Sequence, residues 1–442
     1  MDDYLVGVLS NIGVISFIAL SAYLLLLTGE ISFGQQAFFA IGAYAAGIAT
    51  ALWGWPLGAA LGWGAAAAGV AAVLVGLPTL RLHGLYFAVA TLAFAEMVRL
   101  IFEQFRYQVV IDGEPVGPNG SDGFRSIRYI FENDIGSLQF LGLIYALLVA
   151  VLAGFILLER TRLGVVFRMI GEDATLAELN GVAVARIKVL AAGLAGALAG
   201  IGGGLYAHLT TYVEPRIFDV MLGVHSLAYG LIGGLGTAFG PLLGVAIDIG
   251  LLESVRVFAG YRMIIFGGLV ALLLILRPRG LLDETVVHYV QRAWRRFGRG
   301  RGLYRMLAVT VLMVCSTGSS GAAEIRARAE VACQPAADRL QYDCSVRLTN
   351  ARTSEPLTGV ALTVGAEMPS MPVMHNVRPA KAMPGQGLGT YQVRLVLEMH
   401  GDWALQLNLS GPMRDRVVTI MRFDAERVVP AAAPKARPGH RH

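Results

Sequence analysis

The stretch LTGEISFGQQAFFAIGAYAAG (27–47) separates two strongly apolar runs, each long enough to cross a bilayer. It places a carboxylate, a hydroxyl, two amides and closely spaced glycines where a membrane span is expected to begin. Within hydrocarbon, backbone that leaves the helix must find its hydrogen-bond partners in the protein. The stretch therefore predicts a membrane protein whose irregular backbone faces other protein or lines a cavity.

The composition agrees with this class. Hydrophobic residues make up 55% of the 442 residues and charged residues 15%, whereas soluble domains carry about 25% charged residues. The small excess of basic residues is unevenly placed, which favours a role in membrane topology over nucleic-acid binding. Walker, HExxH and GxSxG motifs are absent from the sequence. We expect a transport subunit and not an enzyme.

Apolar runs of about 20 residues, the length of a helical span, recur as far as residue 277. The sequence predicts an all-α polytopic membrane domain of about nine transmembrane helices. The expected spans are 5–27, 31–51, 57–77, 84–102, 138–158, 189–209, 220–236, 239–257 and 262–277.

Basic residues orient these spans. They gather in the loop 159–188 and in the stretch 277–305, which the positive-inside rule places in the cytoplasm. Counting spans from either loop gives the same arrangement, with the N-terminus and the segment 103–137 outside.

The pattern changes after residue 285. Residues 286–323 combine a basic start, a short apolar core and a small-residue end, which is typical of a signal peptide or a further span. Residues 324–429 alternate apolar and polar positions in short runs between turn residues and predict a small all-β sandwich outside the cytoplasmic membrane. Residues 430–442 have the composition of a disordered tail.

Two cysteines fit an oxidising compartment. Cys333 and Cys344 lie on adjacent predicted strands, so we expect a disulfide between them. The alternative is a pair of buried free thiols.

A second polar interruption, LIGGLGTAFGPLLGVAIDIG (231–250), repeats the glycine, hydroxyl and Phe-Gly cadence of the first. Paired interruptions in the two halves of a transporter favour a translocation path. The alternative is a plain cytoplasmic turn between antiparallel spans at each place. The candidate path residues are Gly29, Ser32, Gly34, Gln35, Gly234, Gly236, Thr237 and Gly240.

Four segments follow one another along the chain: TGEISFGQQAFFAIGAYAA, LRLHGLYFAVATLAFAEMVRLI, RTRLGVVFRMIGEDATLAELNGVAVARIKVLAAGLAGALAGIGGGLYAH and GLIGGLGTAFGPLLGVAIDIGL with LILRPRGLL. Together they resemble the LivM-type permeases of branched-chain amino acid ABC importers. The resemblance covers about residues 5–285 and implies a permease domain over 1–285. Permeases for urea and short-chain amides look nearly the same, so that substrate class stays open.

The resemblance implies a bacterial inner-membrane complex. This chain would pair with a LivH-like permease, two ATPase subunits that bind the ATP, and a periplasmic substrate-binding protein. The chain itself would carry no cofactor for transport.

The loop 159–188 contains the run LAELNGV (176–182), which resembles the coupling helix of this family. A permease without an ATP site must receive its driving force from another chain, and a short helix between two spans can dock on an ATPase. The residues assigned to this loop are Gly171, Glu172, Asp173, Ala177, Glu178 and Gly181. The alternative is a solvated basic loop that only sets topology.

The predicted outer domain carries the loop EMPSMPVMHNV (367–377), which together with GTYQVRLVLEMHGDWALQLNL resembles YtkA-like and FixH-like extracytoplasmic domains. Thioethers and imidazole are soft ligands suited to Cu(I), and Met368, Met371, Met374 and His375 are the candidate ligands. The chain would then be a copper-handling membrane protein. The alternative is that the methionines fill the end of the sandwich.

Two further patterns bear on the spans. Glu96 and Arg99 lie one helical turn apart, which predicts an ion pair and weakens a third hypothesis, a secondary transporter with an ion-coupling carboxylate. Gly196, Gly200 and Gly204 form a close-packing face for another helix, in this chain or in a partner permease.

Overall fold

The computed structural model describes most of the chain. The described residues are 3–79, 81–82, 84–111, 114–252, 262–277, 280–282, 326–336, 340–369, 376–411, 413–425 and 427–430. They fall into two compact units. The first comprises 1–99, 135–210 and 218–320, and the second 100–134, 211–217 and 321–442. The expected signal-like segment 286–323 lies outside the described residues, as does nearly all of the expected tail.

The first unit is helical. Its elements are α1 (Asp3–Leu26), α2 (Gln35–Ala51), α3 (Leu57–Thr79), α4 (Leu85–Gln104), α6 (Ser137–Arg160), α7 (Arg162–Glu172), α8 (Ala174–Leu179), α9 (Val184–Thr210), α10 (Val220–Gly233), α11 (Phe239–Val245), the π-helical segment η3 (Ala246–Leu252) and α12 (Arg262–Leu276).

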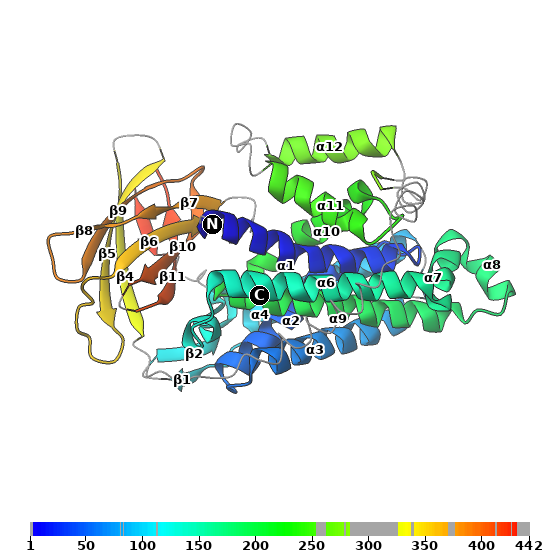
Figure 1. The fold of residues 1–442 in the computed structure, drawn as a ribbon, viewed down its shortest axis with the longest axis horizontal. Coiled ribbons are helices and arrows are strands. Elements are labelled where there is room, and N and C mark those ends of the chain that lie inside the picture. The colour runs from blue at the N-terminus through cyan, green and yellow to red at the C-terminus, as the bar shows by residue number, and fades with distance from the viewer. Residues whose placement is uncertain are drawn as a thin grey trace, which may run out of the picture. The chain divides into compact units, whose positions relative to one another are not determined.

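Each expected span overlaps a helix of the described residues (Figure 1). The expected span 239–257 overlaps α11 and η3 as far as residue 252, and its last residues lie outside the described residues. Five of these helices, α1, α3, α4, α6 and α9, are long and apolar enough to cross a membrane. The helices α10 and α12 are shorter, with 14 and 15 residues. The helical membrane class is thereby confirmed, and the count of nine spans stays a prediction.

Small residues let the central helices of this unit pack closely. A Cβ at Gly200 of α9 would lie 2.7 Å from the carbonyl oxygen of Gly64 in α3, and one at Gly204 would lie 2.7 Å from the side chain of Leu61. The backbone of α3 leaves no room for a methyl group at Gly200, so glycine is required there for the close approach. The glycine face of α9 therefore packs within this chain, against α3 and α2, and needs no partner permease.

The second unit contains a β-sandwich at its C-terminal end. Its strands are β4 (Ala327–Pro335), β5 (Gln341–Asn350), β6 (Ala361–Glu367), β7 (Asn376–Lys381), β8 (Met383–Pro384), β9 (Thr390–Val396), β10 (Gly401–Ser410), β11 (Asp415–Phe423) and β12 (Val428–Pro430). They form a five-stranded sheet in the order β12-β11-β10-β6-β7 and a four-stranded sheet in the order β4-β5-β9-β8.

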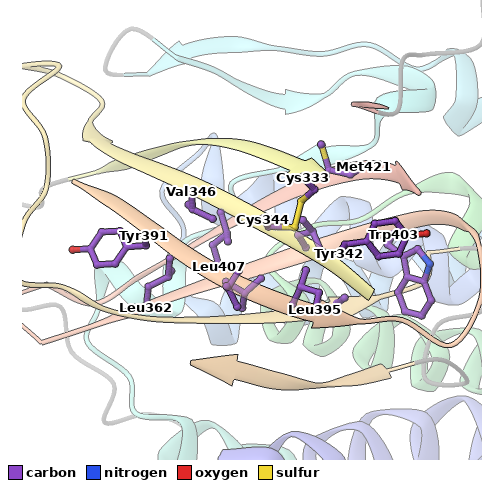
Figure 2. Close-up of a cluster of buried hydrophobic side chains, with 14 of the residues drawn as sticks. Cys333, Tyr342, Cys344, Val346, Leu362, Tyr391, Leu395, Trp403, Leu407 and Met421 are labelled. Carbon is purple, nitrogen blue, oxygen red and sulfur yellow. A yellow bond between two sulfur atoms is a disulfide. The ribbon is translucent and has the colours of Figure 1, made fainter. Parts of the chain in front are cut away.

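The alternating sequence of these strands produces the core between the sheets. In β5 buried and exposed residues alternate, with Tyr342, Cys344, Val346 and Leu348 buried. Trp403 and Leu407 of β10 meet them from the other sheet, as Figure 2 shows. The structure joins Cys333 and Cys344, which are paired across β4 and β5, by a disulfide.

The segment between α4 and α6 is also folded. It contains β1 (Val109–Ile111), β2 (Glu114–Pro118), the 3-10 turn η1 (Gly120–Asp122), β3 (Phe124–Arg125) and the short helix α5 (Tyr129–Glu132). The three strands form a small antiparallel sheet. Phe124 and Val213 exchange backbone hydrogen bonds of 2.6 and 2.8 Å, which ties this segment to the connection between α9 and α10, where η2 (Pro215–Phe218) lies.

Candidate functional site

The first interruption begins with a turn that packs against α7. Gly29 follows α1 with φ +77°, a conformation that side-chain-bearing residues rarely adopt. A Cβ at Gly29 would lie 3.2 Å from the Cα of Gly171, and one at Gly171 would collide with the carbonyl oxygen of Leu27. The two glycines thus allow backbone-to-backbone contact between this turn and α7.

The next residue of the turn forms a buried ion pair. Glu30 Oε1 accepts from Lys188 Nζ of α9, and the two side chains are only 6% and 10% exposed. Burial of two charges is costly unless they are paired, and removal of one partner of such a pair costs about 3–5 kcal/mol. The pair therefore fixes the turn against the start of α9.

The remainder of the interruption finds its hydrogen bonds in neighbouring side chains. The backbone N–H of Phe33 donates to Thr91 Oγ1 of α4 at 3.1 Å, and that of Gly34 donates to Ser32 Oγ at 3.2 Å. Gln35, the first residue of α2, is fully buried and accepts from Ser21 of α1 through Oε1. Irregular backbone is satisfied by other protein here, as the sequence predicts.

Two amide atoms at the start of α2 have no hydrogen-bond partner within the described part of the chain. They are Gln35 Nε2 and Gln36 Oε1, and the two residues are 0% and 1% exposed. A Cβ at Gly223 of α10 would collide with the Gln36 amide. The glycine at 223 thereby makes room for a buried polar side chain between α2 and α10.

The second interruption is a compact loop between α10 and α11. Gly234 has φ +96°, and a Cβ at Gly233 would collide with the carbonyl oxygen of Gly240. The chain after α12 closes the loop, because Leu282 donates to Gly233 O at 2.8 Å and accepts from the N–H of Gly236 at 3.2 Å. Gly234, Gly236 and Gly240 therefore lie in a loop that is closely packed and held by the chain after α12.

Helix α7 contacts both interruptions. Arg168 Nη2 donates to the carbonyl oxygen of Gly236 at 3.1 Å, and Gly171, one helical turn further on, meets Leu27 and Gly29. Arg168 also lies 3.6 Å from the Glu159 carboxylate at the end of α6. Two segments about 200 residues apart in the sequence are therefore linked by two neighbouring residues of a single helix.

The short helix α8 follows α7 and exposes apolar side chains. Asp173 caps it by accepting from the Leu176 N–H at 2.9 Å, and Ala177 is buried with Ile170 of α7. On the outer side Leu176 is 53% exposed and Leu179 is 81% exposed. Exposed apolar groups clustered on one short element are typical of a contact surface for another protein.

The remaining residues assigned to this loop lie where they can serve such a surface. Glu172 and Glu178 are exposed, and Gly181 ends the segment with φ +80°. A side chain at that position would be strained, which explains the glycine.

Sequence reasoning missed the roles of Arg168 and Lys188, which it used only to orient the membrane spans. Arg168 is 68 residues from Gly236, and Lys188 is 158 residues from Glu30. No local pattern signals either contact, since the pairings depend on how α7 and α9 pack. The only available signal was the carboxylate of Glu30 at a predicted span boundary, which requires a partner.

Other assigned residues have mixed outcomes. The ion pair expected within α4 is confirmed, with Arg99 Nε 2.9 Å from Glu96 Oε2. Met368 is 3% exposed and belongs to the sandwich core, where it has the role of apolar filler. Met371, Met374 and His375 lie outside the described residues.

Comparison with known proteins extends these observations. A family model described as "Branched-chain amino acid transport system / permease component" matches residues 4–277. The permease protein LivM of the high-affinity branched-chain amino acid transport system is 31% identical in Salmonella typhimurium and 30% identical in Escherichia coli, each over 280 residues. Each match covers 59% of this chain and 65% of the LivM protein.

A second group of relatives matches less of the chain. The LivH permease protein of Escherichia coli is 28% identical over 144 residues, which cover 32% of this chain and 46% of that protein. No solved structure matches.

Proposed function

Because the chain belongs to the permease family of branched-chain amino acid transport systems, we propose that it is the permease subunit of an ABC importer that moves branched-chain amino acids across the bacterial inner membrane. Family membership supports a multi-pass transport subunit and not an enzyme. The substrate class follows the names of the LivM and LivH relatives, which belong to branched-chain amino acid transport systems. These names lend no support to urea or amide transport.

The observation that carries the mechanism is the contact of α7 with both interruptions. We expect an ATPase subunit to bind α8 through Leu176 and Leu179, with the acidic residues Glu172, Asp173 and Glu178 beside them. Movement of α8 would pass to α7, with which it shares the buried Ile170 and Ala177. From α7 it would reach the first turn through Gly171 and the second through Arg168.

The start of α2 favours a path that opens beside these turns. Trp53 and Trp55, just after α2, and Trp63, near the start of α3, are exposed, and their ring centroids lie 5.4–6.3 Å apart. Such a cluster is typical of a membrane–water interface. The 17 residues of α2 span about 25 Å at 1.5 Å per residue, less than the roughly 30 Å of hydrocarbon. Gln35 and Gln36 would then lie within the bilayer.

Buried amides at the N-terminal end of a helix that begins within the bilayer suit a zwitterion. Under this proposal Ser32, Gly34 and Gln35 line the path in the first half of the chain. Gly234, Gly236, Thr237 and Gly240 line it in the second. Gly29 transmits the movement of α7.

The complete transporter would contain other chains. The match to LivH proteins supports pairing with a second, related permease. In an ABC importer the ATP would be bound by other chains, which we expect to be two ATPase subunits. A periplasmic binding protein would deliver substrate. The α7–α8 segment would face the cytoplasm and the β-sandwich the periplasm, as the distribution of basic residues predicts.

The test is substrate-stimulated ATP hydrolysis and uptake in liposomes that contain all subunits. Leucine is expected to stimulate hydrolysis, and urea, tested in parallel, is not. Stimulation by urea alone would contradict the proposed substrate. No stimulation by leucine in a complex shown to be assembled would contradict the amino acid importer itself.

A substitution on α8 tests the proposed ATPase-binding surface formed by Leu176 and Leu179. Leu179→Asp is expected to abolish stimulation by weakening ATPase binding, since a charge replaces an apolar anchor. Leu388→Asp changes an equally exposed leucine of the β-sandwich unit (77% exposed) and should leave stimulation unchanged. Normal ATPase binding by the Leu179→Asp variant would exclude α8 as the docking helix.

A further inference from the structure

The short helix α5, between α4 and α6, contacts the C-terminal β-sandwich through charged and aromatic side chains. Both belong to the same compact unit, although about 190 residues separate them in the sequence. Their contacts comprise a buried ion pair, an aromatic contact and two further ion pairs.

The buried pair joins Arg128 to Asp415. Arg128 Nη1 lies 3.2 Å from Asp415 Oδ2, and the side chains are 10% and 4% exposed. Asp415, at the start of β11, also accepts from the N–H of Ala327 at the start of β4. Since β4 and β11 belong to different sheets, Arg128 binds a carboxylate that links the two sheets of the sandwich.

The aromatic contact places Phe131 of α5 between two arginines of the sandwich. The guanidinium carbons of Arg414 and Arg416 lie 5.7 and 5.6 Å from the ring centroid. Both distances fall within the roughly 6 Å over which a cation is attracted to an aromatic face.

Two acidic side chains complete the surface. Glu132 Oε1 lies 3.3 Å from Arg326 Nη2, and Asp134 Oδ1 lies 3.6 Å from Arg414 Nη1. The loop therefore presents two acidic groups and a ring to arginines of the sandwich, and Arg128 of the loop pairs with Asp415 of the sandwich. Complementary charge of this kind specifies one partner surface over others.

We propose that the segment 128–134 is a docking site for the C-terminal β-sandwich and holds it without help from the covalent connection. A long connecting segment provides only a modest effective concentration, so a sandwich held in one place needs contacts of its own. The buried Arg128–Asp415 pair fits this requirement, because each charge is costly when left buried alone. A cut near Ala323, where the signal-like segment ends, would then leave two chains that remain bound.

The test uses the full chain in lipid nanodiscs, with a specific protease site inserted after Gly318. After complete cutting, gel filtration is expected to show the sandwich eluting with the membrane part. Elution of the sandwich as a separate species, in the cut protein that carries no other substitution, would overturn the proposal.

Matched variants test the surface itself. Phe131→Ala is expected to speed release of the cut sandwich about tenfold or more, whereas Phe105→Ala, at a partly exposed ring of the same loop, should not. Glu132→Arg and Arg326→Glu should each speed release, and the two together should restore binding. Protection of the Cys333–Cys344 disulfide from reduction shows that each released sandwich is folded. Failure of the exchanged pair to restore binding would count against this surface.

Discussion

Gly29 and Gly171 lie in backbone contact, with the position of a Cβ on Gly29 only 3.2 Å from the Cα of Gly171. The first belongs to the turn after α1 and the second to the last turn of α7. This backbone contact gives the proposed coupling a direct mechanical route from α7 to the turn that leads into α2.

Gly171→Ala is expected to reduce leucine uptake about tenfold or more. Alanine would otherwise favour the helix by about 1 kcal/mol, but its methyl group would collide with the carbonyl oxygen of Leu27, and overpacking of this kind costs about 1–3 kcal/mol. Uptake by the reconstituted complex measures the effect. The control is Gly154→Ala in α6, where a Cβ has open space. Equal uptake by the two variants would refute the coupling role of Gly171.

Lys188→Met is expected to destabilise the chain by about 3–5 kcal/mol, because it leaves the Glu30 carboxylate buried without its partner. The double variant Glu30→Gln/Lys188→Met removes both charges and should recover much of that loss. Thermal unfolding of the purified chain in detergent gives the comparison. A double variant that is less stable than Lys188→Met would show that the ion pair is not what holds the turn.

Glu214→Gln is expected to remove the pH dependence of the stability of the connection between α9 and α10. Burial raises the pKa of Glu214 to about 7, against the opposing effect of Arg216 and Arg125 and with a further increase from Asp402 and Asp122. A raised carboxyl pKa means that the folded form prefers the protonated acid. The stabilisation that the protonated Glu214 gives to the folded form is complete below its ordinary pKa of 4.5 and is lost as the pH rises through about 7.

Hydrogen exchange at the Phe124 and Val213 amides measures this effect, since these two groups close the connection. After correction for the intrinsic exchange rate, opening should be more frequent at pH 8 than at pH 5 in the native chain. The Glu214→Gln variant should open equally at both pH values. A native chain that opens equally at both would exclude the raised pKa.

Replacement of Cys333 and Cys344 by serine is expected to destabilise the β-sandwich by about 3 kcal/mol. The disulfide closes a short loop, whose cysteines are 11 positions apart in the sequence, and loops of this size restrict the unfolded chain by about that much. Pulse proteolysis in urea reports the stability of the sandwich. Cys315→Ser, outside the described residues, is the control and should have no effect. An unchanged urea midpoint in the double variant would contradict the prediction.

The sequence predicted those features that depend on local pattern. Long apolar runs identify α1, α3, α4, α6 and α9, because crossing a bilayer requires about 20 apolar residues. Alternation of period two identifies the strands of the sandwich, since successive side chains point to opposite faces. The four-residue glycine spacing in α9 predicted a close helix contact, although not that α3 provides it.

Contacts between distant segments depended on the tertiary structure. Arg168 and Lys188 carry basic charge that the sequence could relate only to topology, and their partners Gly236 and Glu30 become neighbours when α7 and α9 pack. Met368 has the composition of a soft metal ligand, yet its position on the inner face of the sandwich makes it part of the core.

By itself, then, the sequence determined that this is a helical membrane protein with a C-terminal β domain, because hydrophobic length and periodicity are properties of a single segment. The tertiary structure decided that α7 connects the two glycine turns and that α5 binds the sandwich. Arg168 and Gly236 are 68 residues apart, and α5 and the sandwich are about 190 residues apart. Such pairings follow from the packing of whole elements and not from the residues of either one.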